Sequence, residues 1–380
     1  MKLSFLQHLL TKNARMLIAL LWLISTLIFI KLFGIVTNLE AEKYIGEAEE
    51  FIKNGSLSAP RFWFYSVTIF IIVLALKLKI GLIGAFIIQG LLNLFAYLFF
   101  YNEIKKIFKI PLTAFFIVTY LMLFWPYQSW IVYLFTESAF YSLILILIGV
   151  LIRYKPDNFK NISIISIALL LVIISRPLGI LFTSGVYIYF FYCANKKWKI
   201  ILGFLSLLFL IVGFYVVNII FSTITDWYIT KPFEQESVIC DLPNANPTNT
   251  KLNLNTTGNP VYQLFYYVTH NFIHFKHFAG VKIQYFFLMT RPYYSKAHNY
   301  FVLVNTIALY ILVMIGFFVK RYQIDKKITA FLLSVIAIYT VTIIFQCDDY
   351  HNRFILSIFP MFVILAAGTV EFIVLSLKRN

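Results

Sequence analysis

Acidic residues cluster directly beyond the first long apolar stretch of the chain. Glu40, Tyr44, Glu47 and Ala48 recur there at helical spacing. A short helix would therefore present Glu40 and Glu47 on one side. Carboxylates at the edge of a hydrocarbon layer are costly unless they are paired or used, and a buried or half-buried carboxylate is a good general base. The structural alternative is a capping box over residues 37–40, in which Glu40 completes a helix start.

A second acidic residue, Glu137, follows Thr136 and opens an otherwise uncharged apolar stretch. At a helix N-terminus an acidic side chain interacts favourably with the helix dipole, which is the structural explanation. The functional explanation is that Glu137 points into an outward cavity and binds a hydroxyl-rich substrate or a cation. The aromatic residues upstream, Trp125, Tyr127 and Trp130, are typical of a membrane interface, and sugar stacking is the second interpretation.

Two arginines are expected close to the membrane, Arg176 before Pro177 and Arg353 before the last apolar stretch. An arginine near mid-membrane costs about 2.5 to 3.5 kcal/mol on insertion scales, so a partner is expected for each. Phosphate is the natural partner, because the fixed charge and fork geometry of a guanidinium suit its oxygens. The alternative is an internal ion pair, for which Asp349 is the obvious partner of Arg353.

Three histidines, His270, His274 and His277, lie at i, i+4 and i+7 in the amphipathic run 261–289. Such a stripe could bind a metal ion, but a further carboxylate ligand at helical spacing is missing. We expect instead a helix that lies on the outer leaflet, in keeping with its Phe and Tyr content. Arg291 then leads the chain back into the bilayer.

The elements that carry these residues are membrane helices. The chain has 380 residues, of which 61% are hydrophobic and 13% charged, and its mean hydropathy is +0.83. No water-soluble fold could cover so much apolar surface. Continuous apolar runs such as 200–221 differ from the short alternating segments of a β-barrel. The sequence therefore predicts an all-α polytopic membrane protein.

The net charge of +16 indicates membrane topology here, and no nucleic-acid partner, because basic residues form short clusters between the apolar runs. These clusters are Lys2/Lys12/Arg15, Lys105/Lys106/Lys109, Arg153/Lys155/Lys160, Lys196/Lys197/Lys199, Lys320/Arg321/Lys326/Lys327 and Lys378/Arg379. The positive-inside rule places them, and both termini, in the cytoplasm. The first loop 38–61 and the long loop 222–299 then lie outside, and with them Cys240 and Cys347, which could form a disulfide.

Ten spanning helices are expected within a single transmembrane domain of residues 1–380. They are residues 16–37, 81–101, 110–125, 137–152, 162–175, 178–195, 199–221, 300–319, 328–346 and 354–376. The apolar segment 62–76 would spoil the even number, so we expect it to be short, tilted or re-entrant, with an eleventh crossing as the alternative. The first outer loop is expected to hold a juxtamembrane helix, and the long loop an amphipathic one.

In this order, these residues resemble the GT-C superfamily of integral-membrane glycosyltransferases, which includes the protein mannosyltransferases and the aminoarabinose transferases of lipid A. In that family an acidic residue of the first outer loop precedes a Tyr by four positions and an Ala by eight, as Glu40 precedes Tyr44 and Ala48. This chain has Glu where the family usually has Asp. The remaining similar elements are Pro126 with Thr136-Glu137, Arg176-Pro177-Leu178-Gly179, and Arg353-Phe354 with Pro360.

The resemblance implies a GT-C-like helix bundle and a transferase that uses a polyprenyl-phosphate sugar. In that scheme Glu40 takes the proton from an acceptor hydroxyl, which attacks the anomeric carbon with inversion. Arg176 and Arg353 hold the departing lipid phosphate. Glu137 positions a sugar or helps to hold a divalent cation, because members differ in their need for metal. The other residues expected to bind substrate are Tyr44, Glu47 and Arg291.

The implied partners are a lipid-linked sugar donor and an acceptor that is a lipid, a glycan or a protein. The absence of eukaryotic sorting signals favours a bacterial inner membrane, with the active site facing the periplasm. Two other classes remain open. An O-antigen (Wzy-like) polymerase also combines many helices with a long outer loop, and it acts on diphosphate-linked glycans. A lipid-glycan flippase or transporter would show inverted halves with interrupted helices, and no such symmetry is evident.

Overall fold

The computed structural model describes residues 12–223, 230–240, 242, 250–255, 257–319, 324–348 and 351–377. Residues of the sequence analysis that lie outside these ranges are Lys2, Lys320, Arg321, Asp349, Lys378 and Arg379. Within the ranges the regular structure is helical, apart from isolated β-bridges that join Val36 to Tyr133 and Ile239 to Asp348. The predicted all-α class is confirmed.

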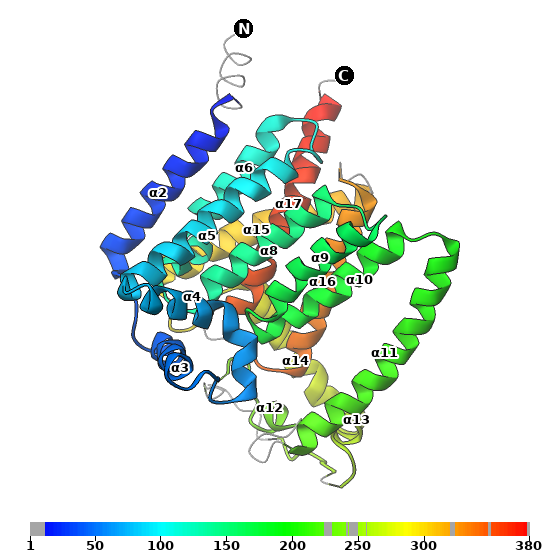
Figure 1. Ribbon diagram of the computed structural model, residues 1–380. Coiled ribbons are helices and arrows are strands. Elements are labelled where there is room, and N and C mark those ends of the chain that lie inside the picture. The colour runs from blue at the N-terminus through cyan, green and yellow to red at the C-terminus, as the bar shows by residue number, and fades with distance from the viewer. Residues whose placement is uncertain are drawn as a thin grey trace. The chain divides into compact units, whose positions relative to one another are not determined.

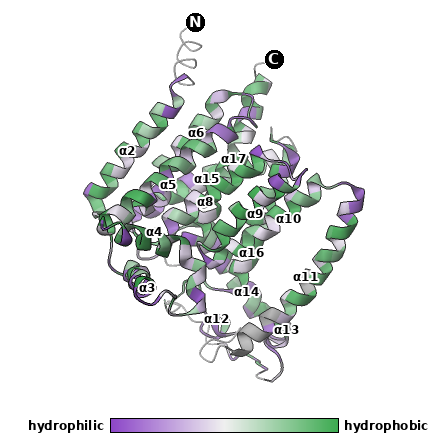
Figure 2. Cartoon of the chain, in the orientation of Figure 1, coloured by the Kyte–Doolittle hydropathy of each residue, from purple (hydrophilic) through white to green (hydrophobic). Residues whose placement is uncertain are grey.

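Eight helical stretches of the described residues are long and apolar enough to cross a membrane. They are α2 (Ala14–Phe33), η1 with α4 (Pro60–Lys77), α5 (Gly81–Ile104), α8 (Thr136–Arg153), α11 (Lys196–Thr223), α15 (Lys296–Val319), α16 (Lys326–Phe345) and α17 (Arg353–Leu377). A ninth results if α6 (Pro111–Leu123) and the following α7–η2 stretch (Trp125–Val132), which meet at 70°, form one broken span. Apolar residues cover these helices, and hydrophilic residues gather at the connections (Figure 2). The chain is an integral membrane protein.

Three predicted segments need comment. The predicted spans 162–175 and 178–195 correspond to α9 (Phe159–Ile173) and to η3 with α10 (Pro177–Cys193), which are shorter than the other spans. The segment 62–76 is η1 (Pro60–Tyr65) and α4 (Ser66–Lys77), and together these have the length and composition of a span. Figure 1 shows α4 beside α3 (Glu40–Asn54), at the end of α2 that is farther from the N-terminus. The choice between ten and eleven crossings stays a prediction.

The chain divides into two compact units. Unit 1 holds Met1–Tyr189, Leu309–Val335 and Leu356–Asn380, and unit 2 holds Phe190–Ala308 and Ile336–Ile355. Among the candidate residues, Glu40, Tyr44, Glu47, Glu137 and Arg176 belong to unit 1. Arg291 and Arg353 belong to unit 2.

Helix α8 forms the centre of unit 1 and is buried on almost every side, against α4, α5 and α9. Buried polar groups fix its first turns. Asn93 of α5 donates a hydrogen bond to the hydroxyl of Ser142 at 3.0 Å, and Ser142 donates in turn to the carbonyl of Ser138 at 2.7 Å. Polar groups inside a membrane bundle must find such partners, since lipid offers none. The network therefore holds the start of α8, where Glu137 lies.

Unit 2 carries the long loop 222–299, whose described part contains α12 (Lys231–Glu234), α13 (Pro260–His270) and α14 (Phe272–Leu288). Asn259 caps α13 by accepting a hydrogen bond from the backbone N–H of Tyr262 at 2.9 Å, and Pro260 occupies the first helical turn. The amphipathic run 261–289 is therefore two helices and not one. They meet at Asn271, whose φ of −126° and ψ of 38° interrupt the helix.

A disulfide joins Cys240 to Cys347, the pair that the sequence allowed. Backbone hydrogen bonds run beside it: Cys240 N–H donates to the carbonyl of Asp348, and Asp348 N–H donates to the carbonyl of Val238, both at 2.8 Å. The long loop is thereby tied to the residues that precede the last helix.

Candidate functional site

Helix α3 begins at Glu40 without a side-chain cap, so the capping-box alternative is wrong. Its N-cap residue is Leu39, which has φ 57° and ψ −124° and whose side chain is exposed. A positive φ is uncommon for a residue other than glycine and carries strain. Ala41, Tyr44 and Ala48 form the fully buried stripe of α3. The helix therefore presents this stripe to α4, against which it packs.

Backbone hydrogen bonds hold the first outer loop against the segment that precedes α8. Val36 N–H donates to the carbonyl of Val132 at 2.9 Å, and Leu134 N–H donates to the carbonyl of Val36 at 3.1 Å. These bonds occur four residues before Glu40 and two residues before Thr136. They bring the starts of α3 and α8 together, although the two helices are far apart in the sequence.

Tyr44 lies at the centre of the candidate site, and its side chain is fully buried. Its hydroxyl donates a hydrogen bond to Glu40 Oε1 at 2.6 Å, and its ring packs against Tyr65. Burial raises the pKa of Tyr44 well above its ordinary value, and the nearby carboxylates of Glu40 and Glu137 raise it further. The guanidinium of Arg176 acts in the opposite direction. Three charged groups from three separate segments thus act electrostatically on the Tyr44 hydroxyl.

Glu137 and Arg176 form an ion pair through Glu137 Oε1 and Arg176 Nη1. The carboxylate is fully buried, and the arginine side chain is 9% exposed. We expected both residues at the site, but we did not predict that they pair with each other. The rule that a membrane-embedded arginine needs a partner is the signal that could have indicated this contact.

Local backbone geometry explains the position of Arg176. Pro177 starts the short η3 helix (Pro177–Leu181), and Gly179 N–H donates to the carbonyl of Arg176 at 2.8 Å. A Cβ atom on Gly179 would lie 2.2 Å from the carbonyl oxygen of Val172, so only glycine fits against the end of α9. The hydroxyl of Ser66 on α4 donates to the carbonyl of Ile174 at 3.2 Å. The turn that carries Arg176 is therefore held by the end of α9 and by Ser66 of α4.

Glu47 is on α3 but does not share the surroundings of Glu40. Its carboxylate accepts hydrogen bonds from the backbone N–H of Ser58 at 3.1 Å and from the Ser58 hydroxyl. The side chain is buried. These contacts fasten the loop after α3 and give Glu47 a structural role. The expected contact of Glu47 with substrate stays a prediction.

Arg291 is fully buried in unit 2 and pairs with the equally buried Asp348 at 2.5 Å. Its guanidinium also donates to the carbonyl of Tyr285 at 3.0 Å, and its backbone N–H donates to Asn299 Oδ1 at 2.9 Å. Asp348 lies next to the disulfide-bonded Cys347. These contacts anchor the loop to the region before the last helix and give Arg291 a structural role.

Arg353 opens α17 and is half-buried. The preceding Asn352 has φ 60° and is 2% exposed, and it donates a hydrogen bond to the carbonyl of Met289 at 2.7 Å. The expected pair of Arg353 with Asp349 involves a residue outside the described ranges.

The histidine stripe does not assemble into a metal site. His274 is buried, with its Nδ1 2.7 Å from the hydroxyl of Tyr267 and its Nε2 3.2 Å from Glu236 Oε1. His270 and His277 are exposed. Across the part of the chain that the structure describes, no three His, Cys, Asp or Glu side chains are placed to hold a metal ion. At the unit 1 site Glu137 faces Arg176, so its residues do not fit a bound cation, and we derive no step through one.

No family model, curated protein or solved structure matches this chain. The functional conclusion therefore depends on the residues themselves, and within unit 1 these are the acidic and basic groups around Tyr44.

Proposed function

We propose that this protein is a glycosyltransferase that moves a sugar from a polyprenyl-phosphate donor to an acceptor hydroxyl on the outer face of the membrane. One observation carries the proposal. Glu40, at the start of α3, accepts the hydrogen bond of the buried Tyr44 hydroxyl, and the ion pair of Glu137 with Arg176 acts electrostatically on the same hydroxyl. The resemblance of these same residues to the GT-C superfamily gives the arrangement its chemical interpretation.

In the proposed reaction Glu40 is the general base. Its half-buried carboxylate takes the proton of the acceptor hydroxyl while the hydroxyl oxygen attacks the anomeric carbon of the donor. A new carbon–oxygen bond forms as the bond from the anomeric carbon to the phosphate oxygen breaks, and the phosphate leaves with the electron pair. The products are the glycoside with inverted configuration and the free polyprenyl phosphate. Tyr44 positions Glu40 through their hydrogen bond.

Arg176 supplies positive charge where the departing phosphate gains negative charge, which is the usual form of electrostatic transition-state stabilisation. Its pairing with Glu137 neutralises a carboxylate that would otherwise repel that phosphate. Glu137 in turn holds the guanidinium in place and lies near enough to Tyr44 to raise its pKa. In the proposal Arg353 is a second contact for the lipid phosphate, a role that rests on the sequence resemblance.

The disulfide between Cys240 and Cys347 supports the outer location of the long loop. Disulfides persist in oxidising compartments and are rare in the cytosol. Together with the positive-inside pattern of the basic clusters, it favours a site that faces the periplasm of a bacterial inner membrane.

Donor chemistry tests the proposal. Purified protein is incubated with undecaprenyl-phosphate sugars and, separately, with a diphosphate-linked repeat unit, and release of the lipid carrier is followed by mass spectrometry. We expect release of the monophosphate carrier, and a loss of about a hundredfold to ten-thousandfold in Glu40→Gln. Glu42→Gln is the matched control, because Glu42 is an exposed carboxylate in the same helical turn.

Each of the other outcomes would contradict part of the proposal. Turnover of the diphosphate substrate alone would assign the protein to the O-antigen polymerases. Turnover of neither substrate would make a lipid-glycan flippase the better explanation. Wild-type activity in Glu40→Gln, at matched expression, would remove Glu40 from the role of base.

A further inference from the structure

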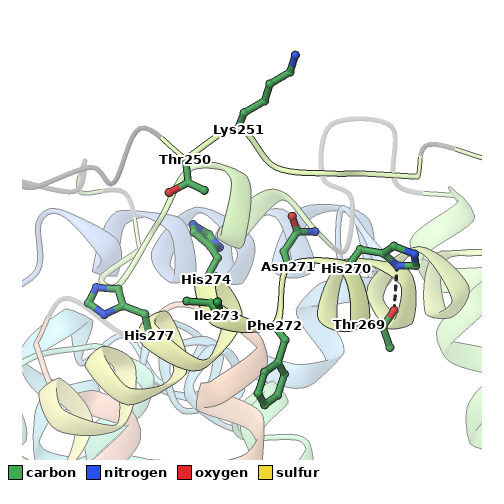
Figure 3. Close-up of a pocket in the computed structure, with 9 residues that line it drawn as sticks. All are labelled: Thr250, Lys251, Thr269, His270, Asn271, Phe272, Ile273, His274 and His277. Carbon is green, nitrogen blue, oxygen red and sulfur yellow. Dashed lines mark hydrogen bonds between the residues drawn. The ribbon is translucent and has the colours of Figure 1, made fainter.

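The hollow at the junction of α13 with α14 in unit 2 is lined by polar side chains, several of which the chain itself engages (Figure 3). The Thr269 hydroxyl donates to a backbone carbonyl of α13 at 3.0 Å, and His270 Nδ1 lies 3.0 Å from the next one. Asn271 and His274 are also bonded within unit 2. Unit 1 differs, because charged side chains at one of its ends keep donors for an outside partner.

The end of unit 1 at which α2 begins and α5 ends is strongly basic. Arg15 Nε of α2 donates to Asn102 Oδ1 of α5 at 2.9 Å, so the two helices meet there. The end of α8 lies at the same place, because Arg153 Nη1 is 3.7 Å from Glu103 Oε1 of α5. Exposed basic residues of these segments and of the connections that follow are Lys12, Arg15, Lys105, Lys109, Lys155 and Lys160. The positive-inside rule predicts that this basic end faces the cytoplasm.

The nearest carboxylate in the sequence does not neutralise Arg15 and Lys105. Glu103 is buried on the side of α5 that faces α8, where Lys106 and Arg153 share its carboxylate. The ion pairs within the described ranges include neither Arg15 nor Lys105. Both side chains therefore keep their full positive charge.

The other groups at the basic end leave this charge in place. The dipoles of α2 and α5 oppose each other, because one helix begins here and the other ends here, so the field comes from the side chains. Asp157 lies in the connection of α8 to α9, between Lys155 and Lys160 in the sequence. Its carboxylate accepts hydrogen bonds from the side chains of Asn158 and Asn161, both at 2.8 Å.

Arg15 and Lys105 converge on Tyr101 of α5. Lys105 Nζ lies 5.6 Å from the centroid of the Tyr101 ring, and the guanidinium of Arg15 acts electrostatically on the hydroxyl of the same residue. The hydrogen bond to Asn102 uses Nε of Arg15 and fixes the direction of the side chain. The two Nη groups then remain as the paired donors that bind phosphate oxygens well, with the Lys105 ammonium as a third donor.

Apolar side chains lead along the helices to this pair of charges. One face of α5 is formed, at helical spacing, by Leu91, Phe95, Leu98, Asn102 and Lys105. Leu91 and Phe95 are exposed, and so are Met16 and Leu20, which follow Arg15 on α2. An acyl chain can therefore lie against either helix while its phosphate reaches Arg15 and Lys105. An inorganic anion would gain nothing from these apolar faces.

We propose that Arg15 and Lys105 bind the phosphate of an anionic phospholipid, whose acyl chains lie against the exposed apolar faces of α2 and α5. Basic groups at the cytoplasmic ends of membrane helices attract anionic head groups. A zwitterionic head group also has a phosphate, but Lys12 and Lys109 at the same end repel its ammonium group. The site is separate from Glu40 and Tyr44, and its occupation requires no sugar transfer.

The test uses the full chain in detergent micelles and lipid titration followed by native mass spectrometry. The probes are dioleoyl-phosphatidylglycerol, dioleoyl-phosphatidylcholine and glycerol phosphate, the last being a phosphate head group without acyl chains. We expect phosphatidylglycerol to bind at least about tenfold more tightly than either other probe, the effect of about one charge-assisted hydrogen bond. The double variant Arg15→Gln with Lys105→Gln should lose about tenfold or more in affinity for phosphatidylglycerol.

A matched control separates a site from diffuse attraction. Lys155→Gln with Lys160→Gln removes the same charge from the same end of unit 1, and it should keep the preference for phosphatidylglycerol. Lys105→Gln alone changes an exposed side chain, leaves the bond of Arg15 to Asn102 intact, and should lose part of the preference even if the double variant does not fold. Equal losses in the two double variants, equal binding of phosphatidylcholine, or equally tight binding of glycerol phosphate would each overturn the proposal.

Discussion

Arg176, on the connection between α9 and η3, pairs with Glu137 at the start of α8, and both side chains are buried. The pair closes a contact across 39 positions of the sequence. Pro177 and Gly179 shape the turn that carries Arg176. The ion pair therefore joins this turn to Glu137, the acidic residue at the start of α8. This connection places a positive charge near enough to Tyr44 to act on its hydroxyl.

Removing one partner of this pair is expected to destabilise the protein. Arg176→Met leaves the Glu137 carboxylate buried and uncompensated, which costs about 3 to 5 kcal/mol. The double variant Arg176→Met with Glu137→Leu removes both charges and should recover most of that loss. Urea unfolding in mixed micelles measures the cycle. If the single variant unfolds like wild type, the pair does not exist in the folded protein.

Tyr44→Phe tests the hydrogen bond that orients the proposed base. The substitution keeps the buried ring and removes the donor 2.6 Å from Glu40 Oε1. Because that donor favours the ionised carboxylate, its loss should move the acidic limb of the pH–rate profile to higher pH and lower the rate at neutral pH. A merely structural role would reduce stability and leave the profile in place. The measurement is carrier release across pH, with Tyr262→Phe, an exposed tyrosine, as control.

Gly179→Ala should destabilise the turn that carries Arg176. The added Cβ would lie 2.2 Å from the carbonyl oxygen of Val172, a backbone atom that can move only together with α9. Overpacking of this kind costs about 1 to 3 kcal/mol. Gly46→Ala is the contrasting control, because nothing lies within 4 Å of the new methyl group on α3. It should stabilise the helix by up to about 1 kcal/mol. Equal thermal unfolding of both variants would contradict the packing argument.

The sequence predicts local features of this fold well. The span expected at 81–101 is α5 (Gly81–Ile104), and the helix expected in the first outer loop is α3. The length of an apolar segment and the polar residues that end it are properties of residues adjacent in the sequence. They can therefore be recognised without knowing how the helices pack.

Contacts between distant segments could not be predicted in this way. Arg291 pairs with Asp348, and Glu371 of α17 accepts the backbone N–H of Ile110 at the start of α6 at 2.6 Å. In both cases the charged residue alone indicates only that some partner is required, and the partner depends on how the helices pack. The break at Asn271 was also missed, because its amide is engaged by Asn253 in a segment without helical periodicity.

Lys282 is the clearest buried charge without a compensating group in the described residues. Its side chain is fully buried on α14, its Nζ has no hydrogen-bond partner, and that atom lies 4.1 Å from the ring centroid of Phe233. Burial lowers the pKa of Lys282 to about 8. In the unfolded chain the pKa of a lysine is about 10.4. Between about pH 8 and pH 10 the unfolded chain therefore binds more protons at this residue than the folded protein does.

Stability should consequently rise as the pH increases from about 8 to about 10, by roughly 3 kcal/mol for this residue. Below about pH 8 the full penalty of the buried ammonium remains, partly offset by up to about 2 kcal/mol from its contact with Phe233. Lys282→Met should therefore be more stable than wild type at pH 7, by about 1 to 3 kcal/mol, and should lack this part of the pH dependence. Urea unfolding in mixed micelles from pH 7 to 10 measures both effects. Lys276→Met, at an exposed position of the same helix, should keep the wild-type slope, and an equal slope in Lys282→Met would show that Lys282 is not buried as a charge.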